Sequence, residues 1–434
     1  MKLSKTGGRG RLLIITVAWA TAILAATNVS AESVRHGAGS GGQNAPQHIG
    51  KPSIVLVSLD GFRWDYPGRI ETPALDELAR RGVRADALIP PFPSLTFASH
   101  YTIATGLTPG QHGIVANRFL DPATGLRYSL RDKDTVGDGW WYGGEPIWVR
   151  AETQGMVTAA FYFVGTEANV SGVRPTDWRG FDVSVPGETR VDQVLDWLAR
   201  PEDVRPHLIT LYLGHVDRAG HDFGPAAPET VEAIEFVDSL LNRLLRGIED
   251  LENAENVGVV VVSDHGMLPY LTDAPRFVVD EVIDMTGVRT AVGGPVLYLH
   301  LDDPARAPGI RDAVNAAWEH GRAWLPDETP AIWGVNNNPR FGEVILVAEP
   351  GYAVVPAALA ESRLPLGSHG WAPEAQAMHG IFYAMGPGLP SGQRLPATRS
   401  TSVYPLLVRW LGLAGPGDDV SSSDEFARLL RAGE

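Results

Sequence analysis

Four largely apolar runs predict the strands of a buried sheet. They are Ile54–Leu59, His207–Leu213, Val257–Val262 and Ile381–Met385. None of them alternates strictly between apolar and polar residues, as a strand with one face in water does. A continuous run is typical of a parallel strand that helices cover on both faces.

Helical patterns fall between these runs. Thr72 followed by Pro73 is a typical helix start, and Gly82 ends that segment. A longer pattern covers residues 228–251, and a last one covers 403–413. The alternation predicts an α/β fold, with one mostly parallel central sheet and helices on both faces.

Two segments carry only weak periodicity. Residues 120–190 and 290–370 are rich in Gly, Pro and Trp. We expect them to be loop insertions that shape a site, rather than separate domains.

The N-terminus has the pattern of a secretory signal. Four basic residues precede an apolar stretch over 12–27, and Val29-Ser30-Ala31 fits a small-residue cleavage site. An uncleaved membrane anchor is the alternative, although the stretch is short for a span. The predicted organisation is a signal peptide (1–31), a flexible Gly-rich linker (32–51), one domain (52–414) and a C-terminal tail (415–434).

The composition of the chain limits the ligands that it can bind and the residues that can form a metal site. The 434-residue chain has a net charge of −15 and contains no cysteine. Such an acidic chain is a poor general binder of nucleic acid or anionic membranes, so cations would have to attract any phosphate. Without cysteine, a metal site must use His, Asp and Glu, and an exported chain depends on its core rather than on disulfides.

Metal-ligand residue types follow three of the predicted strands. Asp60 follows the first, Asp217 and His221 follow the second, and Asp264 and His265 follow the third. A single Asp after a strand is ordinarily a turn residue. However, the carboxyl ends of strands in an open α/β sheet form one edge, and this edge is where sites occur. The joint pattern therefore predicts a set of metal ligands.

A sixth donor comes from the Gly-rich stretch before the last strand. His369 in GSHG is the favoured candidate, and His379 competes with it. Six nitrogen and oxygen donors divide into two sites, which suits a pair of zinc ions or similar cations.

Thr96 stands where a proline-rich loop becomes a helical segment over 96–105. The ordinary interpretation is a helix N-cap. Beside two cations, its hydroxyl could instead be activated as a nucleophile, at a helix start that also attracts phosphate oxygens. His100 lies one turn later and is expected to point along the helix, so metal activation is the better account.

These residues stand in motifs that resemble the nucleotide pyrophosphatase/phosphodiesterase family of the alkaline phosphatase superfamily. The motifs include SLDGFRWDY, PSLTFASHYTIATGLTPGQHGIVAN, VDRAGHDFGP, SDHGM and GSHGW, and the match runs from about Pro52 to Gly412. The resemblance implies an alkaline-phosphatase-like fold and two Zn²⁺ ions. It also implies hydrolysis of phosphodiester or pyrophosphate bonds of nucleotides through a phosphothreonine intermediate.

The resemblance further implies a role for each site residue. One zinc ion would be held by Asp60, Asp264 and His265, with Thr96 as the nucleophile beside it. The other zinc ion would be held by Asp217, His221 and His369. Asn117 matches an asparagine that binds a phosphate oxygen together with the backbone N–H next to Thr96, and Phe97 and Phe181 match aromatic residues that clamp a nucleobase.

Several other functions compete with this one. A phospholipid or choline-phosphate diesterase and a phosphonate hydrolase would share the scaffold. A monoesterase is disfavoured because the segment 96–105 has no arginine, and a sulfatase because its C/S-x-P-x-R motif is absent. An inactive metal-binding protein would ordinarily have lost a ligand or the nucleophile. We therefore expect a small-molecule substrate, no nucleic-acid polymer, no stable membrane anchor after cleavage, and a periplasmic or secreted location.

Overall fold

The computed structural model describes residues 42–415, 426 and 429–430. The predicted signal peptide over 1–31 lies outside the described residues, as do the first part of the predicted linker and most of the predicted tail. The domain boundaries at 52 and 414 stay a prediction.

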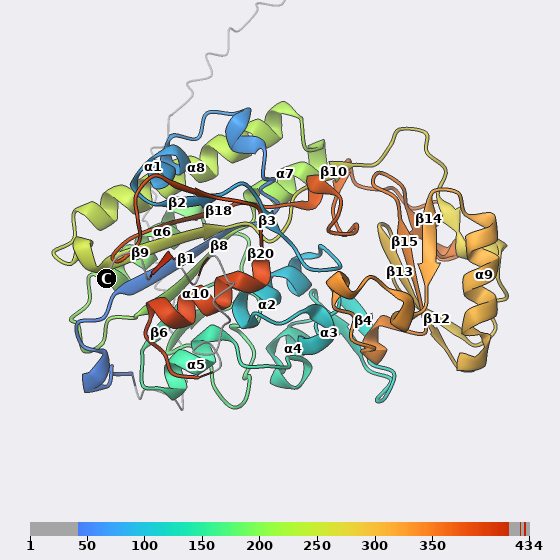
Figure 1. Cartoon of the computed structure of the whole chain (residues 1–434), viewed down its shortest axis with the longest axis horizontal. Helices are drawn as coiled ribbons and strands as arrows, with labels where there is room; N and C mark the ends of the chain where they lie inside the picture. Colours follow the sequence, from blue (N-terminus) through green and yellow to red (C-terminus); the bar gives the residue numbers. More distant parts are fainter. Residues whose placement is uncertain (1–41, 416–425, 427–428, 431–434) are drawn as a thin grey trace, which may run out of the picture. The chain divides into compact units, whose positions relative to one another are not determined.

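An eight-stranded sheet forms the centre of the fold (Figure 1). Its strand order is β19-β2-β18-β9-β1-β8-β6-β7. The bounds along this order are β19 (Gln393–Leu395), β2 (Val83–Ala85), β18 (Phe382–Met385), β9 (Val257–Val262), β1 (Ser53–Leu59), β8 (Leu208–Leu213), β6 (Thr158–Phe161) and β7 (Asp177–Arg179). Strand β1 pairs in parallel with both β8 and β9, while β18 runs antiparallel to β9 and β2.

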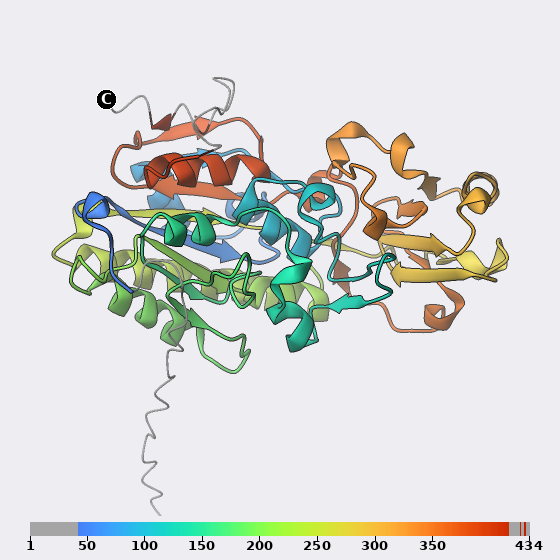
Figure 2. The same cartoon turned by 90° about the horizontal axis from the view of Figure 1, so that it is seen from below.

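Helices cover both faces of this sheet, as the sequence predicts (Figure 2). Alternate side chains of β1 point to opposite faces. Val55 and Val57 enter one core, and Ile54 and Leu56 enter the other. The first core contains side chains of α1 (Pro73–Arg81), α6 (Gly187–Leu198) and α8 (Pro228–Glu249). The second contains side chains of α2 (Thr96–Thr105), α5 (Ile147–Thr153) and α10 (Val403–Trp410).

The segment 120–190 is more than a loop insertion. Strands β6 and β7 of the central sheet come from it, and β6 pairs in parallel with β8. The sequence Thr158-Ala-Ala-Phe161 has no β-branched run, so its pattern did not identify a buried strand. Its neighbours in the sheet determine its conformation.

The segment 290–370 also has regular structure that its periodicity did not predict. It supplies most of an antiparallel sheet in the order β12 (Val288–Val292), β13 (Val296–Leu301), β15 (Val344–Ala348) and β14 (Gly321–Trp324). Helix α9 (Ala307–Ala317) packs against this sheet through Ile310 and Val314 and shares a separate core with it (Figure 1). Other α-helices in the described part of the chain are α3 (Pro109–His112), α4 (Lys133–Gly137) and α7 (His215–Phe223).

The described end of the segment predicted as a linker packs on the domain. The Asn44 side chain donates hydrogen bonds to the carbonyl oxygens of Glu202 and Arg205 at 2.9 and 2.7 Å. Its own carbonyl oxygen accepts the Val157 N–H at 2.8 Å. From residue 42 onward this segment is therefore attached to the fold.

Asp238 on α8 caps the start of α1. Its two carboxylate oxygens accept the N–H groups of Ala74 and Leu75 at 3.0 and 3.1 Å. Thr72 stands at the N-cap position, but its side chain makes no cap hydrogen bond. The buried carboxylate of Asp238 thus satisfies donors that the helix itself cannot.

Replacing Asp238 by Ala is expected to lower the free energy of unfolding by about 1–2 kcal/mol, because two helix-start donors lose their acceptor. Urea unfolding followed by circular dichroism measures this. Glu235→Ala, at an exposed position of the same helix, is the control and should change stability by about 0.5 kcal/mol or less. Equal midpoints for the two variants would show that Asp238 does not act as a cap.

Candidate active site

Strand register brings three carboxylates together at one edge of the central sheet. Asp60 directly follows β1, Asp264 lies just beyond β9, and Asp217 lies in the first turn of α7 after β8. Because β1 pairs with β8 and β9 in parallel, the three strands end at the same level. Asp60 and Asp264 are each only 1% exposed.

Gly61 allows the close approach of Asp217. Its φ is +70°, and a Cβ at this position would lie 2.8 Å from the Asp217 Cα. The Asp217 N–H donates to the Asp60 carbonyl oxygen at 3.0 Å. A glycine is needed here because other residues would clash and rarely adopt this backbone conformation.

The first donor group surrounds His265. Its Nε2 lies 3.0 Å from Asp264 Oδ2, 3.5 Å from Asp60 Oδ1 and 3.3 Å from Thr96 Oγ1. Ligands at the corners of a tetrahedron with bonds of about 2.0–2.2 Å are about 3.3–3.6 Å apart. The separations from Asp60 and Thr96 therefore fit a zinc-sized cation, and the separation from Asp264 is slightly shorter.

The second donor group surrounds Asp217. Its Oδ1 lies 3.4 Å from His221 Nε2 and 3.6 Å from His369 Nε2. The three ligand atoms lie within 4.8 Å of one another. His379, the competing candidate for this position, instead hydrogen-bonds the Pro373 carbonyl oxygen through Nε2 at 2.8 Å.

All three imidazoles are held in the tautomer that a metal ligand requires. Nδ1 of His221, His265 and His369 lies 2.7, 2.9 and 2.9 Å from the carbonyl oxygens of Gly367, Gly266 and Ser94, respectively. A carbonyl oxygen only accepts hydrogen bonds, so each Nδ1 carries a proton and each Nε2 faces the carboxylates, where it can bind a cation once it carries no proton. This orientation fits cation binding.

Electrostatics favours cations at the same place. Burial, followed by Asp264 and Asp217, raises the pKa of Asp60 well above its usual range, and burial raises the pKa of Asp217 to about 7. Burial also disfavours ionised Asp264, but His265 and His100 hold its pKa well below the usual range. Asp60 Oδ1 and Asp217 Oδ1 are buried and have no hydrogen-bond partner within the part of the chain that the structure describes. Bound cations would satisfy both oxygens.

Thr96 is the first helical residue of α2, and Leu95 occupies the N-cap position. The ordinary interpretation of Thr96 as an N-cap is therefore wrong. Its hydroxyl instead faces His265 in the first donor group.

Sequence reasoning missed the role of His100, which does not point along the helix. It is fully buried, with Nδ1 2.9 Å from the Thr96 carbonyl oxygen and 3.2 Å from Asp264 Oδ2. Its Nε2 lies 2.8 Å from the Ser58 hydroxyl. Its spacing from Thr96 could have indicated this role, because a residue four positions after Thr96 lies on the same helix face.

Tyr212 on β8 was also missed. Its hydroxyl donates to Asp60 Oδ2 at 2.6 Å, and its ring is 6.2 Å from that of Phe181. Nothing in the sequence pattern indicates this contact, because it depends on the pairing of β8 with β1.

A cavity of about 600 Å³ opens beside the two donor groups. The side-chain oxygen of Asn117 accepts the Phe97 N–H at 2.9 Å, so this backbone group next to Thr96 is engaged by Asn117. The amide NH₂ of Asn117 remains to donate to a ligand. Phe97 and Phe181 both line the cavity, and Phe181 is 46% exposed.

Comparison with known proteins decides the family. The family model described as type I phosphodiesterase / nucleotide pyrophosphatase matches residues 54–372. The chain belongs to this family. The resemblance inferred from the motifs is thus confirmed, and membership supports hydrolysis of phosphodiester or pyrophosphate bonds.

Relatives of this family member are found in distant organisms. An uncharacterised pyrophosphatase/phosphodiesterase of Schizosaccharomyces pombe is 34% identical over 405 residues, covering 90% of this chain and 83% of the relative. Venom phosphodiesterase 2 of Crotalus adamanteus is 29% identical, with 91% of this chain and 49% of the relative covered. The chain thus spans about half the length of that venom enzyme.

A solved structure confirms the fold class. Murine ectonucleotide pyrophosphatase/phosphodiesterase 5 superposes on this family member with a TM-score of 0.80 at 28% identity, covering 87% of this chain and 99% of the murine chain. The predicted α/β architecture of the alkaline phosphatase type is therefore correct. Among the described residues, no helix combines the length and apolar character needed to cross a bilayer.

Tyr212→Phe is expected to weaken divalent-metal affinity about 10- to 100-fold, because Asp60 loses the hydroxyl that orients it. Competition with a chromogenic chelator measures this affinity. Tyr352→Phe is the control, since its ring stacks on His320 and does not line the cavity. Unchanged affinity in Tyr212→Phe would show that the hydrogen bond does not support a metal ligand.

Proposed function

We propose that this family member hydrolyses phosphodiester or pyrophosphate bonds of nucleotides, with two zinc ions and a phosphothreonine formed on Thr96. The main support for this proposal is the position of Thr96. Its hydroxyl stands at a helix start, 3.3 Å from His265 Nε2, and faces the cavity that contains Phe97 and Asn117.

The donor groups fit two cations. Asp60, Asp264 and His265 would hold one, and Asp217, His221 and His369 would hold the other. When bound, the cations supply positive charge that makes a hydroxyl more acidic and offsets charge developing on the phosphoryl group.

The chain's own residues then carry the reaction. Thr96 Oγ forms a bond to phosphorus as the bond to the leaving oxygen breaks, and the leaving alcohol or phosphate takes up a proton. The Asn117 amide donates to a non-bridging phosphate oxygen, and the unpaired N–H groups at the start of α2 favour the same negative charge. Water then attacks phosphothreonine, which releases the nucleotide and restores the hydroxyl.

The cavity wall supports a nucleotide more than a choline headgroup. Phe97 and Phe181 offer faces for a base, and Arg131 and Lys133 add positive charge to the lining. A quaternary ammonium group would be repelled by these two residues, although Glu167 and Tyr162 would attract it. Murine ectonucleotide pyrophosphatase/phosphodiesterase 5 has been solved as an inactive threonine-to-alanine variant with AMP.

We further propose that the protein is exported from the cytoplasm. Relatives are named as venom enzymes and ectoenzymes. The signal pattern over 1–31 supports cleavage after Ala31 and a periplasmic or secreted product.

Thr96→Ala is expected to lower kcat for a nitrophenyl ester of TMP by at least about 1,000-fold without loss of zinc, because the attacking oxygen is absent. Nitrophenol release measures the rate, and metal analysis measures zinc content. Thr153→Ala, at an exposed position of α5, should keep full activity. Full turnover by Thr96→Ala would overturn the mechanism, and loss of wild-type activity on chelation would support the metal requirement.

Phe181→Ala is expected to raise KM for the TMP ester about 10-fold or more, since stacking of a base contributes about 1–3 kcal/mol. KM for bis-nitrophenyl phosphate, which has no base, should change little. Phe223→Ala removes a ring of similar exposure, 49%, that does not line the cavity and serves as the control. Equal effects on the two substrates would argue against a base clamp.

A further inference from the structure

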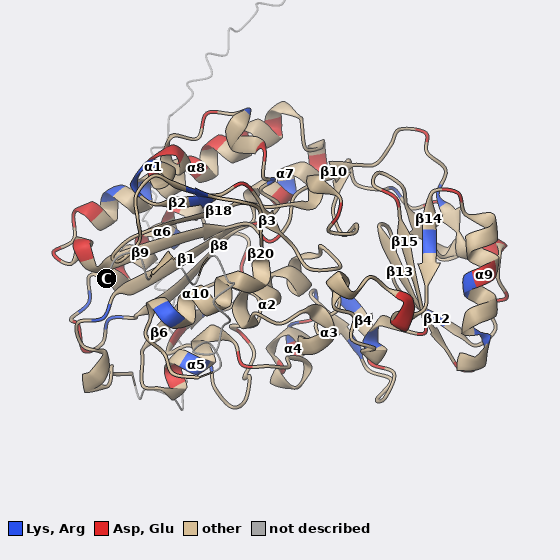
Figure 3. Cartoon of the chain, viewed as in Figure 1, with Lys and Arg blue, Asp and Glu red and all other residues tan. Residues whose placement is uncertain are grey.

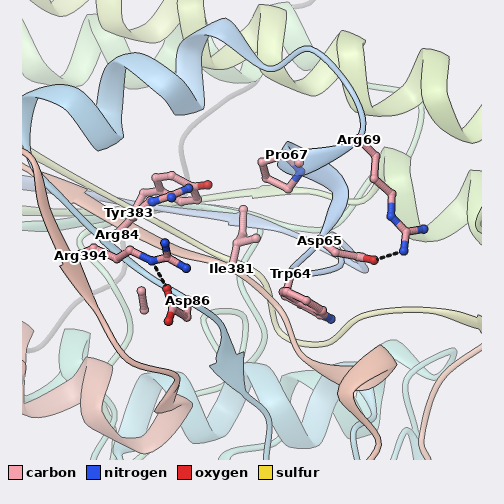
Figure 4. Close-up of a pocket in the computed structure, with 11 residues that line it drawn as sticks. Trp64, Asp65, Pro67, Arg69, Arg84, Asp86, Ile381, Tyr383 and Arg394 are labelled. Carbon is pink, nitrogen blue, oxygen red and sulfur yellow. Dashed lines mark hydrogen bonds and ion pairs between the residues drawn. The ribbon is translucent and has the colours of Figure 1, made fainter.

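A second cavity, of about 410 Å³, lies on a different part of the sheet (Figure 4). Its walls come from the loop after β1 and from strands β2, β18 and β19. None of the residues assigned above to the catalytic site lines it. Whatever it binds, it is separate from Thr96.

Strand register places two arginines side by side in this cavity. Arg84 on β2 is the register partner of Arg394 on β19 and of Tyr383 on β18. Register partners on neighbouring strands point to the same face of a sheet, and like charges in this relation repel. Figure 4 shows the Arg84 side chain beside the Tyr383 ring, and Arg394 next to Arg84 with its guanidinium paired to Asp86. Figure 3 shows the basic segment at β2.

The carboxylates that line the cavity already have partners. Asp86 pairs with Arg394, while Asp65 pairs with Arg69 at 2.5 Å and with Arg63 at 2.7 Å. Within the described chain, no carboxylate lies at ion-pair distance from Arg84, which is half-buried. Its neighbour is the Tyr383 hydroxyl. A half-buried guanidinium without an ion-pair partner is unusual in a chain with a net charge of −15.

Part of the wall is apolar. Trp64, Pro67 and Ile381 line the cavity opposite and beside the arginines (Figure 4). The volume is within the range of small-molecule sites, which combine apolar walls with a few charged groups. Arginine forks match the paired oxygens of a carboxylate or phosphate.

We propose that this cavity binds a small organic anion, with its carboxylate or phosphate-type group between Arg84 and Arg394 and its flat apolar body against Trp64 and Ile381. The anion supplies the ion-pair partner that Arg84 lacks and joins Asp86 as a partner of Arg394. This ligand site does not depend on the proposed catalytic function.

Isothermal titration of the zinc-loaded protein with benzoate and with phenylphosphonate tests the proposal and distinguishes the two anionic groups. We expect at least one probe to show a binding event that Arg84→Gln weakens at least tenfold and that Asn117→Ala, in the catalytic cavity, leaves unchanged. Arg118→Gln, at an exposed arginine on another strand, is the matched control. An event lost in Asn117→Ala but kept in Arg84→Gln belongs to the catalytic site and overturns the proposal.

Two further variants test the same binding site if Arg84→Gln folds poorly. Arg84→Lys keeps the charge without the fork and should bind more weakly than wild type. Arg394→Gln changes a side chain that is 65% exposed and should also weaken binding. Wild-type affinity in both variants, or no binding of either probe to the wild-type protein, overturns the proposal. If the melting temperature of ligand-free Arg84→Gln lies within about 2 °C of wild type, loss of stability does not explain its weaker binding.

Discussion

Repulsion among three carboxylates, two of them buried, is the constraint around which the catalytic end of this fold is organised. Parallel pairing of β1 with β8 and β9 brings Asp60, Asp217 and Asp264 to one sheet edge, where Asp60 and Asp264 are buried and Asp217 is partly exposed. Such a concentration of charge is stable only when positive groups compensate it. Imidazoles oriented by backbone carbonyl groups face the same edge, and cations bound there would provide that compensation.

Thr96, the proposed nucleophile, is positioned by the same set of contacts. His100 joins α2 to the sheet, because its ring reaches Ser58 on β1, Asp264 after β9 and the carbonyl oxygen of Thr96. Helix α2 therefore cannot shift without disturbing the donor groups. The hydroxyl of Thr96, which makes no helix cap, is held toward His265. Rigid placement of this kind is what a reaction that depends on in-line geometry requires.

The two cavities differ in the sign of the charged residues that strand pairing brings together. Carboxylates gather at the catalytic edge, where they would hold cations, whereas arginines lie on neighbouring strands at the second cavity, where we propose an anion. Both groups of like-charged residues arise from strand pairing, which can place like charges next to one another whatever the net charge of the chain. Net charge alone therefore describes neither site.

The sequence by itself determined the main strands and the residue types of the site. Buried parallel strands are continuous apolar runs, so β1, β8 and β9 were recognisable, and an Asp directly after such a strand can only lie at its carboxyl end. Tertiary structure alone decided the antiparallel direction of β18, the strands within 120–190 and 290–370, the contacts of His100 and Tyr212, and the pairing of Arg84 with Arg394. The physical reason is that these features depend on which strands become neighbours and in what register, and that is determined by packing between segments far apart in the chain.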